Sequence, residues 1–259
     1  MVSRSHPRPP VDPALLNHGA PDALWTNLGD WTGTSDYTAA ATALAVRVGE
    51  AASLGPGDSV VDYACGYGDS LRLWVERFGV RRVVGVEPDP QVCERVRARI
   101  AGWGLRDRVS IVASRAELLA PRRVAADVTA VVCVDAAYHF RTRLAWWQML
   151  AADLPAGARV AASDILMADR RRPGPALRWI ARAMGIPAEN LVDASVLRTA
   201  LIEQGLQDLQ LTSIGASVLD GFATHAPRRG LAMRVTGYSL RALRARGMID
   251  YALIRAIRR

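Results

Sequence analysis

Short apolar runs rich in β-branched residues alternate along this chain with longer amphipathic runs, and this alternation most limits what the chain can fold into. The apolar runs predict strands at residues 59–63, 82–86, 109–113, 128–134 and 159–163. Residues 89–103 form the clearest helical candidate between them, with apolar residues on one face and arginines opposite. Near-continuous apolar strands that alternate with helices are typical of a parallel sheet covered on both faces. We therefore expect an α/β, doubly wound fold.

The size and composition of the chain indicate one folded domain. It has 259 residues, of which half are apolar and 22% are charged, so it can bury a substantial core. The proline-rich residues 1–20 are expected to form a disordered tail, and residues 21–259 a single domain with its core at 53–166. No signal-peptide pattern and no apolar run of about 18 residues is present, so we expect a cytoplasmic protein.

The alternation of strand and helix patterns changes after Asp164. A break at Arg-Arg-Arg-Pro-Gly-Pro opens a candidate lid at about 170–192, and the C-terminal strands are expected within 207–259. Here the pattern predicts strands at 209–214 and 249–257, and helices at 177–184, 193–205 and 229–246. A further helix is predicted at 39–52, ahead of the first strand.

The composition excludes several chemistries. All 33 basic residues are arginine, so the chain lacks the lysine that a pyridoxal-phosphate Schiff base, a Walker-A loop or a kinase-type ATP site requires. The three cysteines form no CxxC pair, and no cluster of acids suggests a metal site. We therefore expect no metal and no disulfide.

The net charge of +8 is concentrated at the C-terminal end. Residues 228–259 contain nine arginines and one acid, Asp250, which accounts for the whole excess. The remainder of the chain is neutral, so a nucleic-acid footprint over the fold is not expected. Leu231, Val235 and Tyr238 lie among these arginines at helical spacing. This basic segment could make a weak contact with an anionic membrane surface.

The most informative segment joins the first strand to a helix through a glycine turn. Gly66 and Gly68 would let the backbone approach a ligand closely at the carboxyl end of the strand, where doubly wound sheets bind nucleotides. A dinucleotide fingerprint needs a third glycine where this chain has Leu71, which argues against a nicotinamide-dependent oxidoreductase.

The pattern of Asp62, Ala64, Gly66 and Gly68 resembles motif I of the class I S-adenosylmethionine-dependent methyltransferases, with Ala64 in place of the first glycine. Glu87 follows Gly68 by 19 residues, directly after the second strand. A carboxylate there can accept hydrogen bonds from both ribose hydroxyls of a nucleoside.

Two later segments extend the resemblance. Residues 133–140, which contain Asp135 and His139, resemble motif IV, and residues 154–165 resemble the turn and fifth strand of the same family. The resemblance covers residues 37–166 with the motifs in order. It implies a Rossmann-like seven-stranded sheet with the last strand antiparallel, a helical lid, S-adenosylmethionine as cofactor and S-adenosylhomocysteine as product.

The resemblance also implies site residues. In small-molecule members a histidine four residues after the motif IV acid acts as a base, which is the spacing of Asp135 and His139, and Asp164 would orient His139. Residues 27–31 resemble a cover helix, in which Trp31 and Tyr37 would shield the sulfonium. The expected catalytic residues are His139, Asp164 and Tyr37. The expected cofactor-contacting residues are Trp31, Tyr37, Asp62, Ala64, Gly66, Gly68, Glu87, Pro88, Arg115, Ala116, Glu117, Asp135 and Tyr138.

The adenine side departs from the family pattern. Where the family has Gly-Asp-Ala, this chain has Ser114, Arg115 and Ala116. A guanidinium cannot accept a hydrogen bond from the adenine amino group, so Glu117 or backbone carbonyls are expected to take that role.

These observations predict transfer of a methyl group from S-adenosylmethionine to an oxygen, nitrogen or carbon of a small molecule, such as a specialised metabolite or a lipid-like compound. One alternative is an RNA methyltransferase, although motif IV lacks the Asn/Asp-Pro-Pro-Tyr/Phe sequence of enzymes that methylate base amino groups. Another is a membrane-surface protein that keeps the cofactor site without catalysis.

Overall fold

A seven-stranded sheet forms the centre of the computed structural model, which describes residues 12–168, 173–225 and 231–259. The strand order is β3-β2-β1-β4-β5-β7-β6, and β1 to β5 are parallel whereas β7 runs antiparallel to both of its neighbours. The strands are β1 (Ser59–Tyr63), β2 (Arg82–Glu87), β3 (Val109–Ala113), β4 (Ala130–Val134), β5 (Arg159–Met167), β6 (Leu206–Ser213) and β7 (Ile249–Arg258). The predicted doubly wound sheet with an antiparallel last strand is confirmed.

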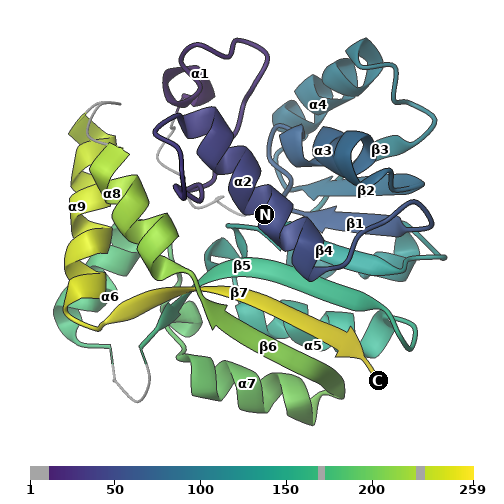
Figure 1. The fold of residues 1–259 in the computed structure, drawn as a ribbon. Coiled ribbons are helices and arrows are strands. Elements are labelled where there is room, and N and C mark those ends of the chain that lie inside the picture. Colours follow the sequence, from purple (N-terminus) through teal and green to yellow (C-terminus); the bar gives the residue numbers. More distant parts are fainter. Residues whose placement is uncertain (1–11, 169–172, 226–230) are drawn as a thin grey trace, which may run out of the picture.

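Helices cover both faces of this sheet, as Figure 1 shows. On one face lie α2 (Tyr37–Ala51), α3 (Asp69–Phe78) and α4 (Pro90–Gly102), whose apolar sides form one core cluster. On the other face lie α5 (Arg143–Asp153) and α7 (Ala194–Glu203), which bury Trp146 and Trp147 in a second cluster. Every residue of β1 is buried, which explains why the central strands are almost continuously apolar.

The C-terminal part adds helices beside the carboxyl ends of β4 and β5. These are α6 (Pro175–Ala183), the short turn η4 (Ala188–Asn190), the π-helical η5 (Ala216–Asp220), α8 (Gly221–His225) and α9 (Leu231–Ala245). The predicted helices at 177–184 and 229–246 correspond to α6 and α9. The segment of η5 and α8 was not predicted. It packs against Trp31 of the N-terminal region through Gly221 and His225.

The N-terminal expectation needs correction. Residues 12–20 are not a tail, because Pro13–Leu16 forms α1 and the Leu16 side chain is buried. The Asn17 amide donates hydrogen bonds to the carbonyl oxygens of Pro13 and Trp25, at 2.8 and 2.9 Å, and so joins this helix to the chain that follows. The rest of the expected tail, residues 1–11, lies outside the described residues, as does 169–172 at the start of the candidate lid. In the described ranges no helix is both long and apolar enough to span a bilayer.

Candidate active site

The glycine turn after β1 has left-handed backbone at three positions, with φ of +57° at Ala64, +53° at Gly66 and +87° at Gly68. A Cβ added to Gly66 would meet only the Thr26 hydroxyl, at 3.7 Å, so the backbone there borders open space. A Cβ on Gly68 would lie 3.0 Å from the Val96 side chain, so this glycine serves the packing of α3 against α4. Gly66 is therefore the position where a ligand can approach the backbone.

Glu87 lies opposite this turn, as predicted. Its side chain is buried at the end of β2, and its carboxylate accepts a hydrogen bond from the Gly66 amide at 3.2 Å and from the Asp89 amide at 3.3 Å. Pro88, which follows it, is exposed. The fold thus brings a carboxylate and the glycine backbone, 21 residues apart, to one point at the carboxyl edge of the sheet.

Asp62 was expected to contact the cofactor, but its side chain is buried in the fold. Its carboxylate is buried beneath the turn and accepts a hydrogen bond from the Trp74 indole at 2.7 Å. Burial raises the pKa of Asp62 to about 6, although hydrogen bonds from Ser70 and Trp74 act in the opposite direction. Asp62 supports the turn by anchoring it to α3.

Asp135 gathers three hydrogen-bond donors at the end of β4. Its carboxylate accepts from the Leu28 amide at 2.6 Å, from the Tyr138 hydroxyl at 2.8 Å and from the Tyr251 hydroxyl at 2.6 Å. Burial raises the pKa of Asp135 to about 7, against the effect of these donors. Tyr251 comes from β7 and was not predicted, because nothing in the sequence indicates which residue of a distant antiparallel strand faces Asp135.

His139 ends the 3-10 turn η3 (Ala137–His139), directly after β4. Its Nδ1 lies 3.0 Å from the carbonyl oxygen of Gly185, in the segment between α6 and η4. A carbonyl only accepts, so Nδ1 must carry a proton, and in the neutral imidazole the lone pair is then on Nε2. This is the tautomer that a proton-accepting Nε2 requires.

The expected pairing of Asp164 with His139 is wrong. Asp164 is fully buried and accepts a hydrogen bond at 2.6 Å from Arg143, which is itself fully buried. Burial raises the pKa of Asp164, and the Arg143 guanidinium opposes this effect. Arg143, the first residue of α5, was not predicted because charge alone does not distinguish it from the many surface arginines.

Asn190 is a second residue that the sequence did not indicate. It lies in η4, and its amide donates to the carbonyl oxygens of Tyr138 at 3.0 Å and Phe140 at 2.6 Å. Its side-chain oxygen accepts from the Arg143 amide at 2.8 Å. These bonds attach the candidate lid segment to the turn that contains His139.

The expected cover helix at residues 27–31 is absent, and the described chain from 23 to 31 has no helix. The Tyr37 hydroxyl is buried and donates to the Asn27 carbonyl at 2.7 Å. The Trp31 ring stacks on His225 of α8 at 4.5 Å, and its indole donates to the Leu28 carbonyl at 2.8 Å. Both aromatics fix the N-terminal segment over the sheet edge.

The adenine-side residues form a local network. The Arg115 guanidinium lies 3.5 Å from Glu117, and Glu117 also accepts a hydrogen bond from the Arg141 amide. Ala116 between them is buried. Glu117 is therefore already used to hold the chain that leads into α5.

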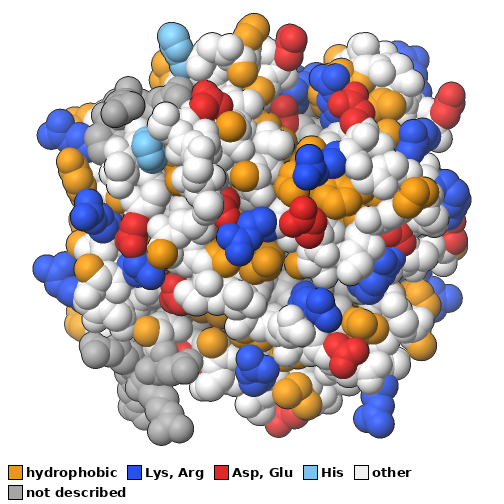
Figure 2. All heavy atoms as spheres, viewed as in Figure 1, with side chains coloured by type: hydrophobic (Ala, Val, Ile, Leu, Met, Phe, Trp, Pro, Cys, Tyr) orange, Lys and Arg blue, Asp and Glu red, His pale blue; other side chains and the backbone are white. Residues whose placement is uncertain are grey.

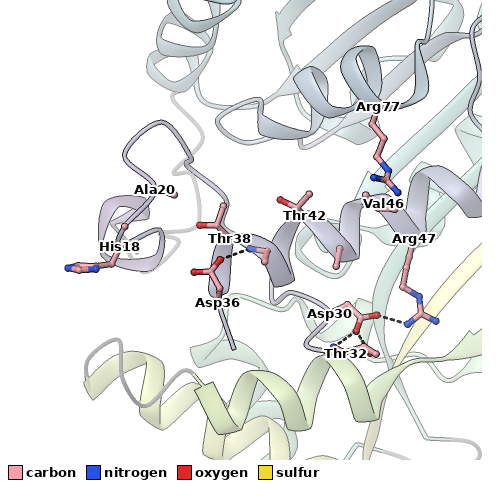
Figure 3. A pocket seen from close by; sticks show the side chains of 13 residues that line it. His18, Ala20, Asp30, Thr32, Asp36, Thr38, Thr42, Val46, Arg47 and Arg77 are labelled. Carbon is pink, nitrogen blue, oxygen red and sulfur yellow. Dashed lines mark hydrogen bonds and ion pairs between the residues drawn. The ribbon is translucent and has the colours of Figure 1, made fainter. Parts of the chain in front are cut away.

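A groove of about 860 Å³ lies elsewhere, on the outer side of α2 (Figure 3). It is bordered by Asp30 and Arg47, which form an ion pair, and by Thr32, Thr38 and Arg77. Burial alone would raise the pKa of Asp30, but hydrogen bonds from Arg47 and Thr32 hold it below its usual value. None of the predicted site residues lines this groove, so we place the site at the sheet edge. No group of three potential metal ligands occurs within the described ranges.

Comparison with known proteins finds methyltransferases. A family model described as a methyltransferase domain matches residues 60–154, which include the glycine turn, Glu87 and His139. Erythromycin 3''-O-methyltransferase of Saccharopolyspora erythraea is 28% identical over 207 residues, which is 77% of this chain and 67% of that protein.

Solved structures share the fold at lower identity. Geranyl diphosphate C-methyltransferase from Streptomyces coelicolor A3(2), with geranyl diphosphate and S-adenosylhomocysteine, has a TM-score of 0.79 at 16% identity, over 95% of this chain and 96% of that one. Phosphoethanolamine N-methyltransferase 2 of Haemonchus contortus, with S-adenosylmethionine, has a TM-score of 0.70 at 12% identity, over 83% of this chain and 52% of that one. The chain therefore contains a methyltransferase domain at residues 60–154 and shares its fold with methyltransferases solved with S-adenosylhomocysteine or S-adenosylmethionine.

Proposed function

We propose that this enzyme methylates a hydroxyl group of a specialised-metabolite or lipid-like acceptor, with His139 as the general base. The observation that carries the proposal is the hydrogen bond between His139 Nδ1 and the Gly185 carbonyl, which leaves the lone pair of the neutral ring on Nε2. A hydroxyl acceptor must lose its proton, whereas an amine can react through its own lone pair. The O-methyltransferase at 28% identity supports the same acceptor atom.

The cofactor fits the turn after β1. Glu87 is a buried carboxylate that faces Gly66, so it is placed to accept hydrogen bonds from the ribose hydroxyls. The open space beside Gly66 admits the ligand close to the backbone. When bound, S-adenosylmethionine supplies an electrophilic methyl group on a positively charged sulfur. In this proposal Pro88, Ala116 and Tyr138 border the cofactor.

The residues of the chain then have separate tasks in the transfer. Nε2 of His139 takes the hydroxyl proton, and the Gly185 carbonyl dipole stabilises the imidazolium that results. The Leu28–Asp135 bond holds the N-terminal segment at the carboxyl end of β4, where it would help to exclude water during the transfer.

The test measures transfer of labelled methyl from S-adenosylmethionine to a panel of acceptors that includes a hydroxyl-bearing macrolide glycoside and geranyl diphosphate. With an accepted hydroxyl compound, His139→Ala should lower turnover by about 100-fold or more while cofactor affinity stays within about twofold. The exposed His18 provides the control, since His18→Ala should leave turnover unchanged. Full turnover in His139→Ala contradicts the base assignment, and methylation of geranyl diphosphate alone contradicts the hydroxyl acceptor.

We also propose that α9 makes a peripheral contact with anionic membranes, which would suit a lipid-like acceptor. Leu231, Val235 and Tyr238 are 71, 57 and 54% exposed at helical spacing, and Arg234 and Arg241 on the same helix are also exposed. Basic side chains are visible along the edge of the molecule in Figure 2 where Figure 1 places α9. An apolar stripe among arginines is the pattern of a helix that lies on anionic lipid.

Sedimentation with vesicles of mixed phosphatidylglycerol and phosphatidylcholine tests this contact. Val235→Glu should move the protein to the supernatant, whereas Ile202→Glu should not, because Ile202 is equally exposed, at 55%, but lies on α7. Equal sedimentation of both variants, or binding to pure phosphatidylcholine, contradicts the proposal.

A further inference from the structure

Asn190 is almost completely enclosed, with 2% of its surface exposed, and all polar groups of its side chain have partners. Its amide nitrogen donates to the Tyr138 and Phe140 carbonyls, and its oxygen accepts from the Arg143 amide. The opposite orientation of the amide would direct its oxygen at two carbonyl oxygens, so the contacts determine the orientation.

The two carbonyls that Asn190 binds belong to the residues on either side of His139. The turn η3 has three residues and no side-chain cap, and so short a 3-10 turn is weakly stabilised by its own hydrogen bonds. The position of η3 therefore depends on contacts with residues outside the turn. Asn190 supplies these contacts from the same segment whose Gly185 carbonyl accepts the hydrogen bond of the His139 ring.

Asn190 is itself held in place by the buried side chain of Arg143. The Arg143 side chain donates to the Asn190 carbonyl at 2.7 Å, and its guanidinium is held by Asp164 at 2.6 Å and by the Ile165 carbonyl at 2.8 Å. The end of β5 thus supports Asn190 through a buried arginine. This arrangement gives Asp164 a link to His139 through Arg143 and Asn190 in place of the direct pairing that the sequence suggested.

We propose that Asn190 is a positioning residue for His139, which keeps the ring bonded to Gly185 and its Nε2 turned toward the acceptor. This inference rests on the proposed function, in which His139 is the base. Without the Asn190 amide the turn is free to shift, and the ring loses the partner that selects its tautomer.

The first test reads the tautomer and needs no acceptor. In protein labelled with ¹⁵N-histidine, the His139 signals are identified by their loss in His139→Ala among the four histidines of the chain. We expect the Nδ1-protonated form in the wild type and a mixture of tautomers in Asn190→Ala. Unchanged His139 signals in Asn190→Ala overturn the proposal.

Asn17 offers a matched control, since it is also buried, at 3% exposure, and its amide also donates to two backbone carbonyls. Asn17→Ala should leave the His139 signals unchanged. If Asn190→Ala does not fold, Asn190→Asp keeps the size and the acceptor for Arg143 while an ionised carboxylate removes both donors, and the same mixture is expected.

The second test is a double-mutant cycle with an accepted hydroxyl compound. Asn190→Ala should lower kcat by about 10-fold with little change in cofactor affinity, and should cause no further loss in the His139→Ala background. An equal loss in both backgrounds shows that Asn190 acts independently of His139 and overturns the proposal. Full turnover in His139→Ala instead overturns the base assignment, and the inference with it, so the two failures are distinguishable.

Discussion

Asp62 shows how one buried carboxylate ties stability to pH. Burial raises its pKa from the usual 3.8 to about 6, so the folded state holds a proton that the unfolded state releases between these values. Stability should therefore fall as pH rises from about 4 to 6, and show no further dependence on this group above that range. Urea unfolding across this range should give a flatter profile for Asp62→Asn, with a pH-dependent difference of about 3 kcal/mol from wild type. Parallel profiles of stability against pH for the wild type and Asp62→Asn would contradict the raised pKa of Asp62.

Ala64 carries a backbone cost that glycine avoids. At φ +57° the left-handed backbone of an L-residue lowers the stability of the folded state by about 1–2 kcal/mol. Glycine avoids this strain, but the greater entropy of its unfolded chain costs about 0.5–1 kcal/mol. Ala64→Gly should thus stabilise the fold by about 0.5 kcal/mol, measured by chemical unfolding. Ala101→Gly, within the helix α4, is the control and should destabilise by about 1 kcal/mol. A loss of similar size at both sites would contradict this account.

At the scale of elements, one buried ion pair connects α5 to β5. Arg143 and Asp164 are both fully buried, so removing one partner leaves an uncompensated charge. Arg143→Met should destabilise the protein by about 3–5 kcal/mol in urea unfolding, and the double variant Arg143→Met with Asp164→Leu should recover much of that loss. A loss below about 1 kcal/mol in the single variant would show that the pair does not matter for folding.

A second ion pair, between Arg99 of α4 and Asp69 of α3, holds the N-terminal segment. The two terminal nitrogens of the Arg99 guanidinium donate to the Asp69 carboxylate, at 2.8 and 2.9 Å. Arg99 also donates to the Asp22 carbonyl at 2.6 Å, and Asp69 accepts a hydrogen bond from the Leu24 amide. Arg99→Leu should speed hydrogen exchange of the Leu24 amide by about 10-fold or more. Arg95, exposed on the same helix, is the control. Unchanged exchange at Leu24 would contradict this role for Arg99.

At the scale of the whole molecule, cofactor binding should stabilise the folded chain. S-adenosylhomocysteine at 100 times its Kd adds about 2.7 kcal/mol, which corresponds to a rise in Tm of about 5–10 °C for a chain of this size. Glu87→Ala should weaken binding by about 1–3 kcal/mol and reduce the rise at the same ligand concentration. Glu76→Ala, exposed on α3, should keep the full rise. An equal rise in Tm for Glu87→Ala and wild type would show that Glu87 does not bind the cofactor.

Much of the fold could be predicted because its signals are local. Burial on both faces makes the strands β1 to β5 apolar, and the glycine turn and Glu87 follow directly from strand ends. The expectation of disorder at residues 12–20 failed because proline content says nothing about a partner: Leu16 and Asn17 are fixed by contacts with the chain that follows.

Local patterns in the sequence were enough to predict the parallel strands and the glycine turn near Glu87, because these depend on periodicity and on the residues that end strands. The antiparallel last strand was expected only from the resemblance to the methyltransferase family. Three contacts became visible only in the folded structure: Asp164 with Arg143, Tyr251 with Asp135, and the turn of His139 with Gly185 and Asn190. These contacts join residues from different elements, and which side chains meet there depends on how the elements pack. No local pattern in the chain encodes that packing.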